Sequence, residues 1–111
     1  MIKNLTVIVV TYLTDKETII NCLKSIDSNI NIKIIENSEK FEFEDEIKSN
    51  FHNVEILNTG KNLGYGKGNN YGLNFVNTDY ALILNPDVIC EKNYFSNLID
   101  NINNIDDFTL L

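Results

Sequence analysis

The stretch Leu5-Thr6-Val7-Ile8-Val9-Val10 is a continuous apolar run, rich in β-branched residues. Apolar and polar residues do not alternate within it, which is typical of a strand buried on both faces of a parallel sheet. Three further short apolar runs predict the strands that lie beside it, at residues 32–35, 54–57 and 80–84. The sequence therefore predicts a sheet of about four strands.

Helical patterns separate these apolar runs. The segment Thr14-Asp15-Lys16-Glu17 resembles a capping box with Thr14 as the cap, and it predicts a helix that ends near residue 28. Further helices are expected over residues 41–51, from residues 66–69 through 76, and over residues 93–103. Alternating strands and helices predict an α/β fold, a three-layer Rossmann-like and mostly parallel sheet with helices on both faces. An unfinished apolar run at residues 108–111 could leave an exposed sheet edge, through which two copies would associate.

Composition narrows the class of protein. A chain of 111 residues with 43% hydrophobic residues fits one globular domain, residues 1–111, with a real core. The net charge of −7 argues against non-specific binding to nucleic acid, and no apolar run is long enough to span a membrane. The two cysteines, Cys22 and Cys90, predict reduced thiols in a cytoplasmic protein rather than a disulfide or a zinc site. The acidic residues cluster between positions 36 and 46, so we expect much of the charge to lie on one solvated helix.

All five glycines lie in one segment, between Gly60 and Gly72. Glycine is needed where the backbone turns through positive φ or approaches another group closely. Lys61 and Lys67 lie in the same segment and could meet an anion, so we expect a loop that closes around a polar, phosphorylated small molecule. The alternative is a plain glycine-rich linker. The segment lacks the Lys-Ser or Lys-Thr of a Walker A loop, and a dinucleotide fingerprint would follow the first strand instead of the third.

Unusual polar segments follow every predicted strand. Thr11-Tyr12 follows the first strand, Glu36-Asn37-Ser38 the second, the glycine segment the third, and Asn85-Pro86-Asp87 the fourth. The carboxyl ends of parallel strands meet at one edge, where ligands bind in such sheets. The shared edge favours a ligand site over a linker.

Individual residues suggest particular roles at this edge. Asp87 is the metal candidate, because Mg²⁺ and Mn²⁺ take one or two protein carboxylates and complete their shell with phosphate and water; its alternative is a turn-forming carboxylate. Glu36 could accept hydrogen bonds from a base or sugar, or it is a solvated strand end. Thr11 and Tyr12 could offer a hydroxyl group and a ring face to a nucleobase, or they pack the loop.

Taken together, these motifs resemble the opening of a family 2 glycosyltransferase of the GT-A fold. The resemblance rests on residues 7–12, on Ile35-Glu36-Asn37-Ser38, on Asn62-Leu63-Gly64 with residues 68–72, and on residues 80–87. Leu84-Asn85-Pro86-Asp87-Val88 is similar to the metal motif of the rhamnosyltransferase-like subgroup. The resemblance covers nearly the whole chain, in the order and spacing of the family.

The resemblance implies a role for each matching residue. It places the donor nucleotide against a set of nine residues and the metal ion, Mg²⁺ or Mn²⁺, at Asp87. Three positions depart from the family pattern: Glu36 stands for Asp, Asn69 for Arg, and Asn85 for the first Asp of Asp-x-Asp. The nine implied nucleotide-binding residues are Thr11, Tyr12, Glu36, Asn37, Asn62, Gly64, Gly68, Asn69 and Asn85.

The resemblance further implies transfer of a hexose, with inversion, from a UDP- or dTDP-sugar to a glycan or lipid-linked acceptor. A complete catalytic domain of the family is about twice this length, and its other part holds the acceptor site and the general base. We therefore expect this chain alone to bind the donor weakly and not to transfer sugar. The resemblance implies a role in bacterial cell-surface polysaccharide synthesis, in the cytoplasm or at the inner face of the membrane. Two alternatives stay open: a degenerate, non-catalytic domain of the same fold, and an unrelated doubly wound phosphate-sensing module.

Overall fold

A parallel sheet forms the centre of the molecule. The computed structural model describes residues 5–103, and its strands are β1 (Leu5–Thr11), β2 (Asn31–Glu36), β3 (Val54–Asn58) and β4 (Tyr80–Leu84). All pair in parallel, in the order β3-β2-β1-β4. β1 lies between β2 and β4, with Val9 opposite Ile34 on one side and Leu84 on the other. The predicted α/β fold is confirmed.

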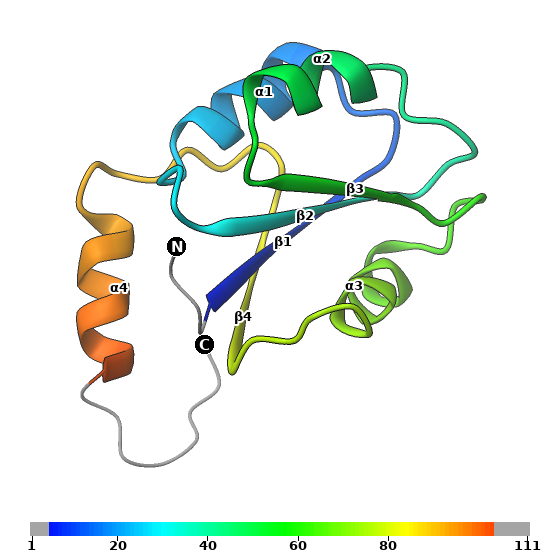
Figure 1. Cartoon of the computed structure of the whole chain (residues 1–111). Coiled ribbons are helices and arrows are strands. Elements are labelled where there is room, and N and C mark those ends of the chain that lie inside the picture. Colours follow the sequence, from blue (N-terminus) through cyan, green and yellow to red (C-terminus); the bar gives the residue numbers. More distant parts are fainter. Residues whose placement is uncertain (1–4, 104–111) are drawn as a thin grey trace.

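Helices cover both faces of this sheet, as Figure 1 shows. The helices α1 (Lys16–Lys24), α2 (Glu44–Asn50) and α4 (Tyr94–Asn103) contribute to one core, and α3 (Tyr65–Leu73) packs against the opposite face. Side chains alternate between the faces along a strand. Along β1, Leu5, Val7 and Val9 therefore join the larger core, while Ile8 and Val10 face α3.

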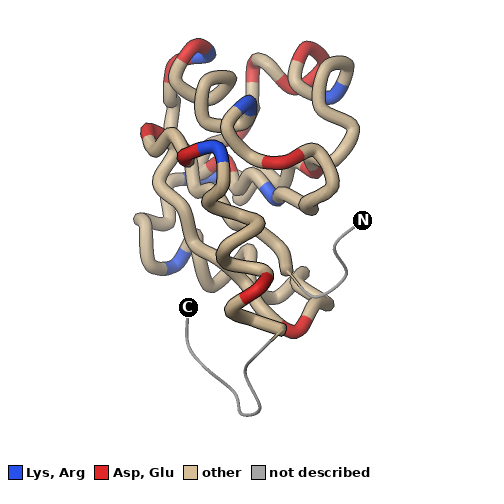
Figure 2. Tube along the Cα trace, turned by 90° about the vertical axis from the view of Figure 1, so that its left-hand side faces the viewer, with Lys and Arg blue, Asp and Glu red and all other residues tan. Residues whose placement is uncertain are grey.

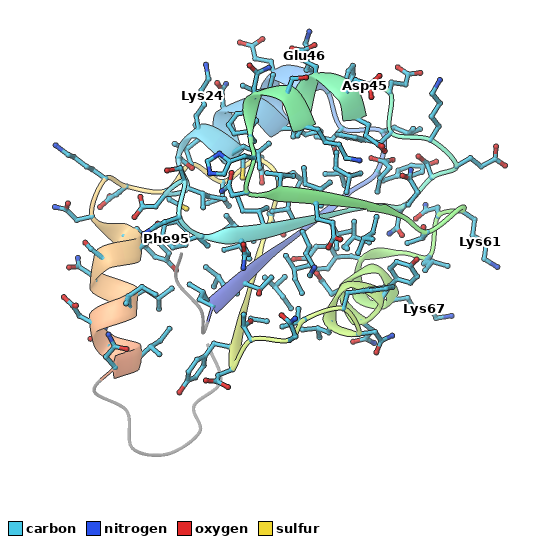
Figure 3. All side chains as sticks on the ribbon, in the orientation of Figure 1. Lys24, Asp45, Glu46, Lys61, Lys67 and Phe95 are labelled. Carbon is cyan, nitrogen blue, oxygen red and sulfur yellow. The ribbon has the colours of Figure 1, made fainter. Side chains whose placement is uncertain are left out.

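Burial explains why β1 is apolar throughout. Each of its seven residues is buried, because helices cover both faces and a strand lies on either side. Full burial of a Val, Leu or Ile side chain contributes about 1.5–3 kcal/mol. Phe95 anchors α4 in the larger core and is 1% exposed (Figure 3).

The fourth strand differs from the other three. Its sequence is apolar, yet only Leu84 is fully buried and Ile83 is 41% exposed. Within residues 5–103, β4 has a strand neighbour on one side only, which is β1. The apolar run was sufficient to predict the strand, and its edge position contributes to the exposure, although β3 at the other edge of the described sheet is more buried.

Several element boundaries differ from the prediction. The capping box with Thr14 as cap is wrong: Asp15 caps α1, and its carboxylate accepts from the backbone N–H of Thr18 at 3.1 Å. The strands β1 and β3 each extend one residue further at their carboxyl ends, and β2 extends one residue at both ends. The helix α2 is shorter than expected, and α3 begins at Tyr65 and ends at Leu73. The predicted run at residues 108–111, and the sheet edge inferred from it, lie outside the described residues.

Only part of the acidic cluster lies on a helix. Glu44, Asp45 and Glu46 open α2, whereas Glu36 ends β2 and is 2% exposed. Figure 2 shows basic positions interspersed among the acidic ones, and Lys16 of α1 pairs with Glu46 of α2 at 3.2 Å. None of the helices within residues 5–103 is long and apolar enough to cross a membrane.

Candidate functional site

The strand order reverses beside β1. The chain passes from β1 outward to β2 and β3, with α1 on one face, and then returns on the α3 side to place β4 on the other flank of β1. In open parallel sheets a ligand crevice forms at such a point, outside the carboxyl ends of the strands. Here those ends are Thr11 of β1 and Leu84 of β4, followed by the Tyr12 and Asn85 segments. The four predicted polar segments therefore do meet at one edge.

Glu36 ties the first two of these segments together. Its Oε1 accepts from the Thr11 hydroxyl at 2.7 Å. Its Oε2 accepts from the backbone N–H of Leu13 at 3.1 Å and from the Ser38 hydroxyl at 2.6 Å. A buried carboxylate is tolerated when it is hydrogen-bonded in this way. Glu36 therefore holds the loop after β1, and it is not the solvated strand end that was one of its two predicted roles.

Asn37 connects β2 to β1 and to the glycine segment. Its backbone N–H donates to the Thr11 carbonyl at 2.8 Å, and its Nδ2 donates to the Gly64 carbonyl at 2.9 Å. Its Oδ1 accepts from the Thr59 hydroxyl at 3.0 Å. Asn37 is 1% exposed, so its side chain positions the wall of the crevice from behind.

The glycine segment needs its glycines for two different reasons. Gly64 caps α3 with φ +86°, a left-handed conformation, and its N–H donates to Oδ1 of Asn62 at 3.0 Å. Gly68 lies against the sheet: a Cβ there would approach Asn37 Nδ2 to 2.8 Å and Val10 Cγ1 to 3.0 Å. The segment is therefore a shaped wall that packs on β1 and β2, and the linker interpretation is wrong.

Three predicted residues of the segment differ in their surroundings. Asn69 is 6% exposed, and its Oδ1 has no hydrogen-bond partner within residues 5–103. A buried acceptor without a partner costs about 1–3 kcal/mol, so we expect a buried water to donate a hydrogen bond to this oxygen. Lys61 and Lys67, by contrast, point away from the sheet (Figure 3). Both side chains are exposed, and they do not enclose a binding site for an anion on their own.

The Asn85–Asp87 segment is joined to the glycine segment through a residue that sequence reasoning missed. The hydroxyl of Tyr65, the first residue of α3, donates to Asn85 Oδ1 at 2.7 Å. The carbonyl of Asn85 accepts from the N–H of Val88 at 3.1 Å, which closes a turn around Asp87. The only signal in the sequence was an aromatic residue directly after Gly64.

Tyr12 and Leu13 project from the crevice. Tyr12 is 52% exposed and Leu13 is 69% exposed, with Leu13 at φ +50°. The ring of Tyr12 is therefore accessible for stacking. Beside Glu36, on the face covered by α1 and α2, lies an open pocket of about 280 Å³. It is lined by Leu13, Thr14, Asp15, Glu36, Lys40, Phe41, Glu42 and Phe43.

Few side chains at this edge could ligate a metal ion. No group of three His, Cys, Asp or Glu side chains within residues 5–103 could hold a metal ion. Asp87 is exposed and offers one carboxylate, while the amide oxygen of Asn85 already accepts from Tyr65. One carboxylate fits Mg²⁺ or Mn²⁺ only if water and ligand phosphate oxygens complete the shell. The residues present thus fit a metal that arrives with a diphosphate.

Cys22 lies behind this turn. Burial raises the pKa of the Cys22 thiol to about 11, with smaller contributions from Cys90 and from the negative charge of Asp87. The backbone N–H of Cys90 donates to the Ser25 hydroxyl at 2.9 Å, and that hydroxyl donates to the Cys22 carbonyl at 2.6 Å. These contacts join α1 to the chain that follows Asp87.

Comparison with known proteins identifies the family. The profile of Glycosyl transferase family 2 matches residues 6–109, so the chain belongs to this family. No protein of curated function matches significantly.

Solved structures support the same fold. A structure of S. aureus TarS 1-349 superimposes with a TM-score of 0.75 at 19% identity, over 90% of this chain and 32% of that one. TarS 1-349 in complex with UDP gives a TM-score of 0.74 at 18% identity, with the same coverage of each chain. The longer S. aureus TarS structure gives 0.67 at 19% identity, over 90% of this chain and 20% of that one. The chain thus has a GT-A type Rossmann-like fold and spans about a third of the length of TarS 1-349.

Proposed function

We propose that this chain forms the nucleotide-sugar site of a glycosyltransferase. The observation that carries the proposal is the hydrogen-bonded assembly of four polar segments where the strand order reverses. Glu36 joins the first two segments, Asn37 joins them to the glycine segment, and Tyr65 joins the glycine segment to Asn85. In a member of family 2, such an assembly is most simply explained as the binding site of the donor.

The residues divide into a supporting set and a contacting set. Glu36, Asn37 and Gly68 are buried and hold the walls of the crevice. The nucleoside lies against the exposed ring of Tyr12, and Asn69, which is buried, belongs with the supporting residues. The donor is a UDP- or dTDP-sugar. UDP is the first nucleotide to test, because a TarS structure was solved in complex with it.

The diphosphate lies at the turn after β4. Asp87 would hold Mg²⁺ or Mn²⁺ there, and such an ion stabilises the negative charge of a leaving diphosphate. Its carboxylate forms no hydrogen bond or ion pair within residues 5–103, so it is free for this role.

Sugar transfer to a glycan or lipid-linked acceptor also needs a base that deprotonates the acceptor hydroxyl. This chain does not itself supply the base. Glu36 is held by three donors, and Asp87 is assigned to the metal. The reaction would take place in the cytoplasm, free or at the inner face of the membrane. Steady sugar transfer by the purified 111-residue chain, proportional to its concentration, would contradict this part of the proposal.

Calorimetric titration tests the proposal. UDP, dTDP and GDP are titrated into the chain with and without Mn²⁺, and we expect UDP or dTDP to bind more tightly with the metal. Asp87→Ala should remove the metal-dependent gain. The matched control is Asp79→Ala, because Asp79 is also exposed but precedes β4 at the opposite end of the strand. Loss of the gain in Asp79→Ala as well would contradict the assignment of the metal to Asp87.

A second candidate function is a non-catalytic domain that has kept the fold and lost the donor site. Three departures from the family pattern favour it: Glu36 for Asp, Asn69 for Arg and Asn85 for Asp. The same titration separates the two functions. Absence of binding for all three nucleotides, with and without Mn²⁺, would support the non-catalytic domain.

A further inference from the structure

Tyr65 and Asn85 form a bridge across the carboxyl end of β1. Tyr65 begins α3, which packs against Ile8, Val10 and Ile35 of the central strands. Asn85 directly follows β4 on the other flank of β1. The 2.7 Å hydrogen bond between them is the contact that links the glycine segment to the turn containing Asp87.

The direction of this hydrogen bond decides what Asn85 can offer a ligand. An asparagine side chain has one oxygen acceptor and an NH₂ group with two donors. Tyr65 donates to the oxygen, so the amide nitrogen is the end directed away from the tyrosine. Within residues 5–103 this NH₂ group has no hydrogen-bond partner, and Asn85 is exposed. The side chain thus presents a neutral donor beside the turn.

The backbone of Asn85 is fixed as well. Its carbonyl accepts from Val88 N–H at 3.1 Å and lies 4.0 Å from the Cys22 sulfur. The amide therefore cannot reorient by a shift of the main chain without breaking the turn around Asp87. Rotation of the side chain alone would break the hydrogen bond that the Tyr65 hydroxyl donates to the Asn85 oxygen.

We propose that Tyr65 is a positioning residue that orients Asn85 as a hydrogen-bond donor to a phosphate oxygen of the bound nucleotide. On this inference, which rests on the proposed function, Asn85 does not ligate the metal. The two polar side chains of the turn then have separate tasks. Asp87 supplies a negative charge for a cation, and Asn85 supplies N–H groups for an anion.

The chemistry of the pair favours this division. A metal ion requires an oxygen lone pair, and the hydrogen bond from the Tyr65 hydroxyl at 2.7 Å already occupies one of the two lone pairs of the Asn85 oxygen. A phosphate oxygen requires a hydrogen-bond donor, and the neutral NH₂ group of Asn85 supplies one. A carboxylate at position 85 could accept the same hydrogen bond from Tyr65, but it would offer no N–H donor. It would also repel the diphosphate in the absence of metal.

The test uses the full chain without metal, with EDTA present, and follows backbone and side-chain amide resonances during titration with UDP and with uridine. We expect Tyr65→Phe and Asn85→Ala each to weaken UDP binding about 3- to 10-fold, the usual range for one lost hydrogen bond. The double variant should be no weaker than Asn85→Ala alone. Uridine affinity should be unchanged in all three variants, because uridine has no phosphate.

Two further variants complete the design. Asn85→Asp should weaken metal-free UDP binding at least as much as Asn85→Ala. Tyr71→Phe is the matched control, since Tyr71 lies on the same helix and its ring packs against Phe75 at 5.3 Å. It should bind UDP as the unchanged chain does.

Several outcomes would overturn the inference. UDP binding in Tyr65→Phe equal to that of the unchanged chain would do so, as would equal weakening of UDP and uridine, which indicates a purely structural role. Tighter metal-free binding of UDP by Asn85→Asp would also overturn it. Failure of the unchanged chain to bind UDP or uridine, with or without Mn²⁺, would instead remove the proposed function and this inference with it.

Discussion

Asn37 leaves no room for a side chain at Gly68. A Cβ on residue 68 would lie 2.8 Å from Asn37 Nδ2, which itself donates to the Gly64 carbonyl at 2.9 Å. The close approach of the helix α3 to the sheet therefore requires glycine at position 68, as it does at position 72, where a Cβ would lie 2.9 Å from Ile35 Cγ1. This close approach brings the start of α3 to the carboxyl edge, where Tyr65 reaches Asn85.

Substitution of two glycines on α3 should have opposite effects. Gly68→Ala should lower the free energy of unfolding by about 1–3 kcal/mol, because Asn37 or the helix must shift. Gly66→Ala is the matched control: a Cβ there meets nothing within 4 Å, and alanine should stabilise the helix by about 0.5–1 kcal/mol. Urea denaturation measures both values. Equal effects of the two substitutions would contradict the close packing of Gly68.

Removal of the charge at Glu36 should destabilise the chain strongly. In Glu36→Gln, one carboxylate oxygen is replaced by an NH₂ group, which faces groups that are themselves hydrogen-bond donors. We therefore expect the free energy of unfolding to fall by about 2–4 kcal/mol. Glu55→Gln provides the comparison, because Glu55 on the neighbouring strand is exposed and should change stability by less than about 1 kcal/mol. Chemical denaturation at neutral pH measures the difference. A loss in Glu36→Gln as small as that in Glu55→Gln would show that the three hydrogen bonds of Glu36 do not stabilise the fold.

The backbone at Leu13 carries strain that a substitution can release. Leu13 has φ +50°, which costs an ordinary side chain about 1–2 kcal/mol, and asparagine tolerates this region better. Since Leu13 is 69% exposed, Leu13→Asn loses little packing and should raise the free energy of unfolding by about 0.5–1 kcal/mol. Leu73→Asn, at an exposed leucine that ends α3, should not stabilise. Thermal or urea denaturation of both variants distinguishes strain relief from a general benefit of removing an exposed leucine.

Alkaline pH should destabilise the chain through Cys22. Its pKa is raised from 9.0 to about 11 in the folded state, so folding favours the protonated thiol. The contribution of the protonated thiol to the free energy of unfolding is fully present below pH 9 and is lost as the pH rises from 9 through 11. The loss is on the order of 2 kcal/mol. Cys22→Ala lacks this titration, so the stability difference between the unchanged chain and the variant should shrink over this range. Denaturation with a reductant present at pH 8, 9.5 and 10.5 measures it, and parallel profiles would show that Cys22 does not contribute.

Much of the fold followed from sequence because local patterns and sheet rules agree. The apolar runs predicted the strands, and the parallel topology placed Thr11, Glu36, the glycine segment and Asn85 at one edge. The cap of α1 could not be chosen from sequence alone, because Thr14 and Asp15 are adjacent and both are good capping residues.

The contacts within the site required the structure. A glutamate at a strand end is usually solvated, and Glu36 is buried only because three donors from two segments converge on it. The bridge from Tyr65 to Asn85 depends on where α3 begins and on how closely it approaches the sheet. Side-chain periodicity carries no information about either quantity.

The central position of β1 also implies an order of events during folding. β1 pairs with β2 across one helical connection, but its pairing with β4 closes a loop that contains β2, β3 and three helices. Longer loops cost more conformational entropy to close, so β4 should dock after the other strands have formed a nucleus. Val9 and Leu84 are register partners that report on the two stages. In stopped-flow experiments Val9→Ala should slow folding, while Leu84→Ala should mainly speed unfolding. The turn that carries Asp87 would then be among the last parts of the crevice to take shape.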